Sequence, residues 1–133
     1  MTKLPAPLAL KRYIIEYANE HGWDYNGPLE TEDQLDEAMV LMHDQIGCDS
    51  EQEIMQGDWE TDIQADYSRY CETKSVAVKD NAGNFIGFTK YYGGGKHFDS
   101  YAWYDTSIEN AYYLTCEEKE VLTIQRTWAK VNA

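Results

Sequence analysis

Apolar residues recur every three or four positions in the first part of the chain, which is the period of a helix with one buried face. The first predicted helix follows Pro5 and Pro7 and ends before Gly22, a residue type that commonly stops helices. The residues on its apolar face are Leu10, Ile14, Tyr17, Ala18 and His21. We expect this face to pack in the core.

A second helix is predicted from Glu32 to Ile46, with Gly47 as its stop. Thr31 and Gln34 have the spacing of a capping box, in which each side chain binds the backbone N–H of the other residue. The buried stripe of this helix is expected to contain Leu35, Ala38, Met39, Met42 and Ile46.

Two shorter helices are predicted next. Ser50 and Glu53 repeat the capping-box spacing ahead of a helix that runs through Met55. Asp58 is placed to cap a further helix, because aspartate is a favoured N-cap residue. One side of that helix would carry Trp59, Ile63 and Tyr67.

From Lys74 onward the apolar period falls to two, which indicates strands. Val76 and Val78 alternate with polar neighbours, residues 80–84 have turn chemistry, and a second strand follows from Phe85 to Tyr92. These features predict a β-hairpin.

Two more strands are predicted at Ala111–Cys116 and Val121–Val131, after a single helical turn that Thr106 would cap. The predicted fold is therefore α+β, with three or four acidic N-terminal helices packed beside a four-stranded antiparallel sheet. We expect residues 1–133 to form one domain, because the helical half (1–66) and the β-rich half (67–133) are each short of core residues.

Charge is distributed very unevenly between these halves. No Lys or Arg lies between Arg12 and Arg69, yet the 56 residues from Tyr13 to Ser68 include sixteen Asp and Glu. Residues 1–66 hold three basic and sixteen acidic side chains, a net charge of -13, whereas residues 67–133 hold eight of each kind. Acid without countercharge is destabilising through self-repulsion, so this region points to a partner or to screening.

Two explanations of the acidity fit poorly. A halophilic protein would spread acid over its entire surface, and a disordered acidic tail would lack the apolar residues found between Tyr13 and Ser68. An ordered acidic surface for a basic partner remains, beside the alternative of an acidic face that serves solubility.

The composition also bears on location. No stretch approaches the ~20 apolar residues that cross a bilayer, and residues 1–10 lack a secretory signal pattern. Cys48, Cys71 and Cys116 fit neither a disulfide framework nor a C-x-x-C metal site, so we expect free buried thiols in a cytoplasmic protein. A negative surface repels phosphates, so we expect no direct contact with nucleic acid or membrane.

The buried stripe of the predicted second helix determines the direction in which its acidic side chains point. At about 100° per residue from Leu35, the side chains of Asp33, Glu37 and Asp44 fall close to the face opposite the buried stripe, with Asp36 at its flank. Asp58, Asp62 and Asp66 recur every four residues and would form a second line on the next helix.

The segment ETEDQLDEAM from Glu30 to Met39, with the lysine-free stretch around it at residues 13–68, resembles small acidic counter-defence proteins of phages and mobile elements, the DNA-mimic antirestriction and anti-CRISPR proteins. The resemblance implies a non-enzymatic inhibitor that occupies a basic nucleic-acid channel on a host enzyme, with carboxylates in place of phosphates. The carboxylates expected to contact this basic protein are those of Asp24, Glu32, Asp33, Asp36, Glu37, Asp44, Asp58, Glu60, Asp62 and Asp66.

An immunity protein that neutralises a nuclease toxin is the alternative, since acidic, aromatic-rich proteins of this size also resemble such antidotes. Carboxylates would steer association, and buried aromatic anchors would slow dissociation. Trp23 and Tyr25 flank Asp24 beyond a predicted helix end and are the candidate anchors.

A small enzyme or ligand-binding protein is the third possibility. Lys96, His97 and Asp99 follow three glycines in the loop 93–99, where they could bind an anion or position a general base. The loop lacks the complete P-loop pattern, however. His21 and His43 are solitary helix residues for which we expect structural roles.

A metal site is not expected. Asp58, Glu60 and Asp62 have the alternate spacing of a calcium loop, but Ile63 and Arg69 occupy the positions that require glycine and glutamate. We therefore predict no dedicated metal and no cofactor.

Overall fold

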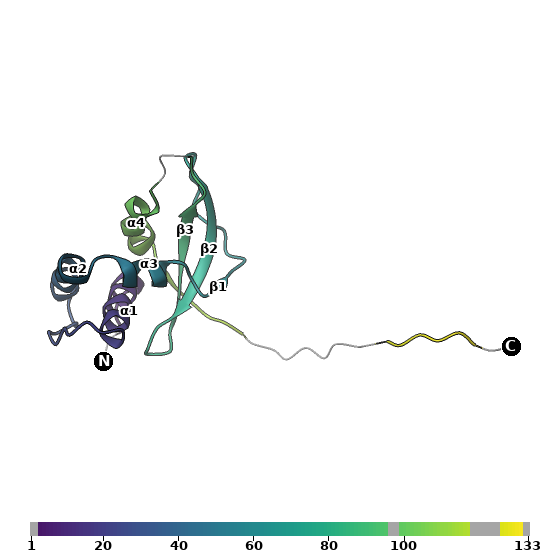
Figure 1. Cartoon of the computed structure of the whole chain (residues 1–133), viewed down its shortest axis with the longest axis horizontal. Coiled ribbons are helices and arrows are strands. Elements are labelled where there is room, and N and C mark those ends of the chain that lie inside the picture. The colour runs from purple at the N-terminus through teal and green to yellow at the C-terminus, as the bar shows by residue number, and fades with distance from the viewer. Residues whose placement is uncertain (1–2, 96–98, 118–125, 132–133) are drawn as a thin grey trace.

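Three helices, α1 (Ala6–Glu20), α2 (Glu32–Ile46) and α3 (Asp49–Met55), precede a four-stranded antiparallel sheet in the computed structural model (Figure 1). The structure describes residues 3–95, 99–117 and 126–131. The helices gather on one side of the sheet, and the predicted α+β fold is confirmed.

The sheet has the order β1–β2–β3–β4, so each strand pairs with its neighbour in sequence. Its strands are β1 (Trp59–Glu60), β2 (Glu72–Lys79), β3 (Phe85–Tyr92) and β4 (Tyr112–Leu114). The 3₁₀ helix η1 (Ser100–Trp103) and α4 (Tyr104–Glu109) connect β3 to β4. Ser107 of α4 donates a hydrogen bond to the carbonyl of Thr89 in β3 at 2.6 Å, which joins this helix to the sheet.

The predicted capping box starts α2. The Thr31 hydroxyl accepts the backbone N–H of Gln34 at 3.2 Å, and the Gln34 side-chain oxygen accepts the N–H of Thr31 at 3.1 Å. Two backbone donors at the helix start are thereby satisfied. The helix then ends at Gly47, as predicted.

The core contains side chains from both halves of the chain. In the hairpin, Val76 lies opposite Phe88 and Val78 lies opposite Ile86, and these apolar pairs join one buried cluster with the helices. Leu10, Ile14 and Ile15 of α1 and Leu35 and Met42 of α2 are fully buried in the same cluster.

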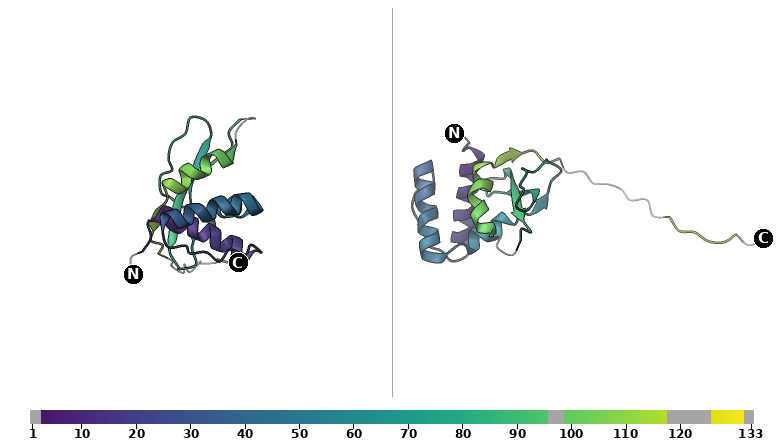
Figure 2. Two further views of the ribbon diagram at one scale, coloured as in Figure 1. Left: turned by 90° about the vertical axis from the view of Figure 1, so that its left-hand side faces the viewer. Right: turned by 90° about the horizontal axis from the view of Figure 1, so that it is seen from above.

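The helices are layered so that α1 lies between α2 and the sheet (Figure 2). α1 contacts α2, α3, α4 and β4, whereas α2 packs chiefly against α1. This arrangement follows from the apolar residues on α1, which has more buried positions than α2. One side of α2 is left facing solvent at the periphery of the molecule.

The helix predicted after Asp58 is wrong. Backbone bonds from Asp58 N to Ala77 O (2.9 Å) and from Thr61 N to Ser75 O (3.0 Å) attach this segment to β2 as strand β1. The Trp59 ring packs edge-on against Phe85, with centroids 5.6 Å apart. The edge of β2 thus binds the backbone groups that would otherwise have formed hydrogen bonds within a helix.

The predicted strand Val121–Val131 is not the fourth strand of the sheet, because β1 takes that place. Residues 121–125 lie outside the described residues, and residues 126–131 are exposed and contain no strand. Two predicted caps are also wrong: Cys48, not Ser50, is the N-cap of α3, and α4 begins before Thr106.

Candidate functional site

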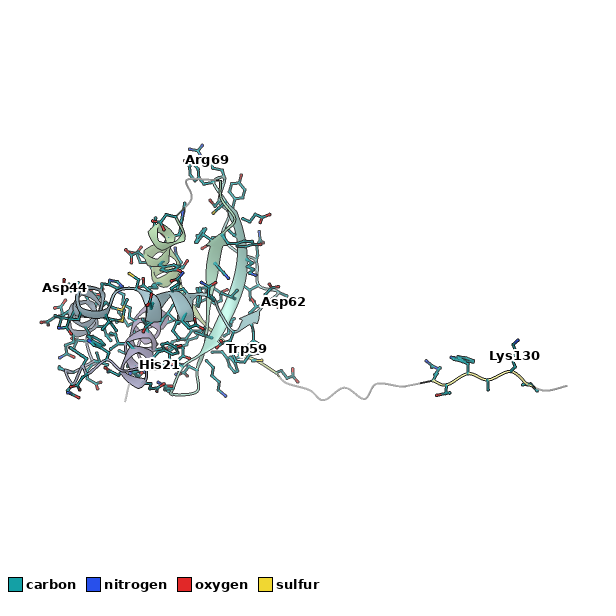
Figure 3. The ribbon with its side chains drawn as sticks, viewed as in Figure 1. His21, Asp44, Trp59, Asp62, Arg69 and Lys130 are labelled. Atoms are coloured by element: carbon teal, nitrogen blue, oxygen red, sulfur yellow. The ribbon has the colours of Figure 1, made fainter. Side chains whose placement is uncertain are left out.

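The outward face of α2 carries a row of exposed side chains that we call the α2 stripe. Its members are Asp33, Glu37, Val40 and Asp44, which recur at intervals of four, three and four residues. Figure 3 shows Asp44 at the outer edge of the molecule, on the side away from the sheet. The buried stripe of Leu35, Ala38, Met39 and Met42 fixes this orientation.

The carboxylates of the α2 stripe form no ion pair with the residues that the structure describes. Among the described residues, no Lys or Arg nitrogen lies within 4.0 Å of Asp33, Glu37 or Asp44. Asp36 differs, since its carboxylate forms an ion pair with Lys11 Nζ of α1 at 2.5 Å. The pair offsets the charge of Asp36, and the three carboxylates of the stripe lack such a partner in the described part of the chain.

The stripe has an apolar residue among its acids. Val40 is 68% exposed, although valine is usually buried. Asp24 and Glu32, on the loop before α2 and at its first residue, are exposed as well. The α2 face therefore offers negative charge around a small apolar contact.

The second predicted line of acids does not exist as a helical ridge. Asp58, Glu60, Asp62 and Asp66 are exposed, but they lie in β1 and the irregular segments around it. Glu60 accepts a hydrogen bond from Lys74 Nζ at 2.8 Å, and this bond lowers the pKa of Glu60.

The two acidic groups lie on different sides of the molecule. Asp62 lies beyond the sheet and Asp44 lies beyond the helices in Figure 3. Asp44 of the α2 stripe and Asp62 beside β1 therefore lie at opposite sides of the molecule in this view.

Trp23, one of the two candidate anchors, is buried within the protein itself. Its side chain is 8% exposed, its indole N–H donates to Gln45 Oε1 at 2.9 Å, and its ring stacks on Tyr25 with centroids 5.1 Å apart. Tyr25 is half-buried, and its backbone is bound by the Asn19 side chain. Trp23 thus packs against Tyr25 and Gln45 within the protein and leaves little of its side chain for a partner to contact.

The outer face of the sheet has an apolar groove of about 520 Å³ that the sequence did not indicate. Trp59 and Ile63 line it and are 49% and 45% exposed. Phe85, Leu114 and Cys116 are also among the lining residues. The groove was missed because residues 59–67 matched a helical period, whereas the structure uses them along the sheet.

A cluster of three potential metal ligands lies where α2 meets α3. One ligand atom each from His43, Cys48 and Glu51 lies within 4.8 Å of the other two. The sequence assigned only structural roles to His43 and Cys48. The spacing H-x₄-C-x₂-E becomes informative only when the turn between the helices is known.

The remaining predicted residues are dispersed. Lys96 and His97 lie outside the described residues, so the ligand-binding interpretation of the loop 93–99 stays a prediction, and Asp99 is exposed. The three cysteines are free thiols, but none is fully buried as predicted: Cys48 and Cys71 are half-buried and Cys116 is exposed.

None of the helices in the described part of the chain combines the length and apolarity needed to span a membrane. Comparisons with known proteins identified no relative of this chain. A scan against protein-family models, a search of curated proteins and a search of solved structures each found no match for the chain.

Proposed function

We propose that this protein is a non-enzymatic inhibitor that covers the basic nucleic-acid-binding surface of another protein, with its carboxylates in place of phosphates. The observation that carries the proposal is the α2 stripe, an exposed row of unpaired carboxylates on the outermost helix. Acidic side chains arranged in this way attract basic clefts and accelerate association with them. Host restriction and CRISPR enzymes are the target classes suggested by the resemblance.

The spacing of the carboxylates in the α2 stripe limits how closely they can imitate the phosphates of DNA. Asp33 and Glu37 are separated by about 6 Å along the helix axis, whereas one DNA strand presents a charge every ~3.4 Å. The stripe is therefore a sparse copy of one strand, and charge alone would give weak binding. The exposed Val40 adds a small apolar area on the same face, and its burial by a partner would add to the contribution of charge.

The test immobilises the protein and passes nucleic-acid-free bacterial lysate over it at low salt. We expect a nucleic-acid enzyme to be retained, and to be released both by salt and by excess duplex DNA. Salt acts because exposed charges are screened within ~8 Å at physiological ionic strength. DNA acts because it competes for the same basic surface.

Charge-matched variants assign the retention to α2. The triple variant Asp33→Asn, Glu37→Gln, Asp44→Asn should retain at least about tenfold less enzyme, since it removes the unpaired carboxylates of the stripe. The control triple variant Glu72→Gln, Asp105→Asn, Glu109→Gln loses the same charge at exposed positions elsewhere and should bind like the wild type. Equal weakening by both triples would show that only net charge matters and would refute the α2 assignment.

An immunity protein for a nuclease toxin is the second candidate, favoured by the apolar groove on the sheet. Exposed Trp59 is the kind of residue that anchors tight complexes. In this case the retained protein would be a nuclease that survives high salt, and Trp59→Ala would release it. Trp128→Ala, at another exposed tryptophan, is the matched control.

A further inference from the structure

The turn between α2 and α3 brings three different metal-ligating side chains together. His43 lies in the last turn of α2, Cys48 is the N-cap of α3, and Glu51 lies in the first turn of α3. His43 Nε2 is 3.3 Å from Glu51 Oε2, and the Cys48 thiol completes the set with all ligand atoms within 4.8 Å of one another.

Burial makes this cluster unusual on an otherwise exposed acidic surface. Glu51 is 4% exposed, Cys48 is half-buried, and His43 is exposed and borders solvent. Desolvation raises the pKa of Glu51, although His43 opposes this effect, and Asp105 of α4 adds to it. Burial likewise raises the pKa of Cys48, with further contributions from Glu51 and Asp49.

Both shifts have the same physical meaning. Desolvation and a neighbouring carboxylate disfavour the ionised form of both Glu51 and Cys48. A bound divalent cation would compensate both groups at once, whereas a proton compensates one group at a time.

We propose that His43 Nε2, Cys48 Sγ and the Glu51 carboxylate bind one Zn²⁺ ion, with a fourth coordination position open to solvent on the His43 side. Imidazole, thiolate and carboxylate are the three ligand types that zinc accepts, and their mixture in a tetrahedral site excludes calcium and magnesium, which take oxygen ligands.

The distances require a small adjustment. Around tetrahedral zinc, neighbouring N, O and S ligand atoms lie about 3.3 to 3.6 Å apart. His43 and Glu51 already have this separation, and Cys48 Sγ lies within 4.8 Å of both, so the adjustment that the site requires is at Cys48. A simple ion pair accounts for the approach of His43 to Glu51 but gives no reason for the thiol beside them.

Cobalt substitution tests the site in the intact protein. Co²⁺ takes the same ligands as zinc, and its bond to a thiolate produces a charge-transfer band in the near ultraviolet. We expect reduced, chelator-treated protein to develop this band at one equivalent of Co²⁺ and to lose it when Zn²⁺ is added.

Alkylation of the wild-type protein locates the site without any substitution. Zn²⁺ should slow iodoacetamide modification of Cys48 at least about tenfold, because a metal-bound thiolate is shielded. Cys71 and Cys116 serve as internal controls and should react at an unchanged rate. Absence of the cobalt band, or equal protection of all three thiols, would overturn the proposal.

Variants then assign the ligands. Cys48→Ser, His43→Ala and Glu51→Gln should each weaken Zn²⁺ binding at least about tenfold in competition with a chromophoric chelator. Cys71→Ser and His21→Ala remove the same residue types elsewhere and should bind as the wild type does. Zinc binding that survives all three ligand variants would show weak attraction to surface acids instead of a site.

Discussion

Asp33 and Asp44 are both unpaired members of the α2 stripe, but they lie at opposite ends of the helix dipole. Asp33 lies in the first turn, where the partial positive charge of the N-terminus favours an anion. Asp44 lies in the last turn, beside exposed carbonyls that repel it. Stability and recognition therefore make opposite demands at Asp44.

We predict that Asp44→Asn raises the free energy of unfolding by about 0.3 to 1 kcal/mol, whereas Asp33→Asn lowers it by a similar amount. Urea denaturation followed by circular dichroism measures both changes. Binding to the basic partner should fall in both variants, because each removes a stripe carboxylate. If Asp44→Asn proved destabilising, an unrecognised favourable contact of its carboxylate would be indicated.

The capping box at Thr31 gives a second prediction for a single residue. Thr31→Ala should lower the free energy of unfolding by about 1 kcal/mol, since the N–H of Gln34 loses its acceptor. Thr31→Ser keeps a hydroxyl at the same place and should retain most of the stability. Equal losses in the two variants would show that the threonine methyl group, not the hydrogen bond, stabilises the helix start.

Among the secondary-structure elements, β1 depends on a close approach of the backbone to β2. Gly57 has a φ of 78°, and a Cβ there would lie 2.5 Å from Val76 Cβ. Gly83 in the hairpin turn has a φ of 89°, and a Cβ there would have no atom within 4 Å. Comparing substitutions at Gly57 and Gly83 therefore separates the effect of the contact with Val76 from the effect of the positive φ.

We predict that Gly57→Ala lowers the free energy of unfolding more than Gly83→Ala, by roughly 1 to 3 kcal/mol, which is the usual effect of overpacking. Both substitutions strain a backbone with positive φ, so the difference reports the clash with Val76. Thermal or urea unfolding of the two variants would measure it. Equal losses would mean that β1 moves away from β2 without penalty.

The elements that the sequence predicted correctly are those defined by local signals. α2 has its capping box, its stop and a buried stripe, and the hairpin from β2 to β3 has alternation around a turn. The prediction of Ile46 as the last member of that stripe is wrong, since Ile46 is 42% exposed at the end of the helix. The acidic face of α2 was predictable for the same reason, because a buried stripe fixes the opposite face.

β1 could not be predicted, since its residues pair with residues of β2 that lie 18 and 16 positions away in the sequence. The burial of Trp23 depends on Gln45 and Tyr25, and the His43 cluster depends on the turn after α2. Each of these features is created by tertiary contacts that a periodicity in the sequence does not report.

At the scale of the whole molecule, the separation of Asp44 of the α2 stripe from Asp62 beside β1 distinguishes modes of recognition. If the partner contacts the α2 stripe, the triple variant Asp58→Asn, Asp62→Asn, Asp66→Asn should leave its affinity within about threefold of the wild type, because exposed charges beyond a Debye length are screened. Titration of the isolated partner at physiological salt would measure the affinity. A loss as large as that of the stripe variant would mean that the partner wraps around the sheet.

The position of α1 between α2 and the sheet also affects how often each helix opens to solvent. Amide hydrogens of α1 are covered from two sides, whereas α2 is held mainly on one, so α2 should exchange its amides with solvent through smaller and more frequent openings. We therefore expect the face proposed for recognition to open to solvent more often than α1 does. A partner bound to the stripe would slow exchange along α2 and leave the hairpin unchanged, so the exchange pattern alone would report where it binds.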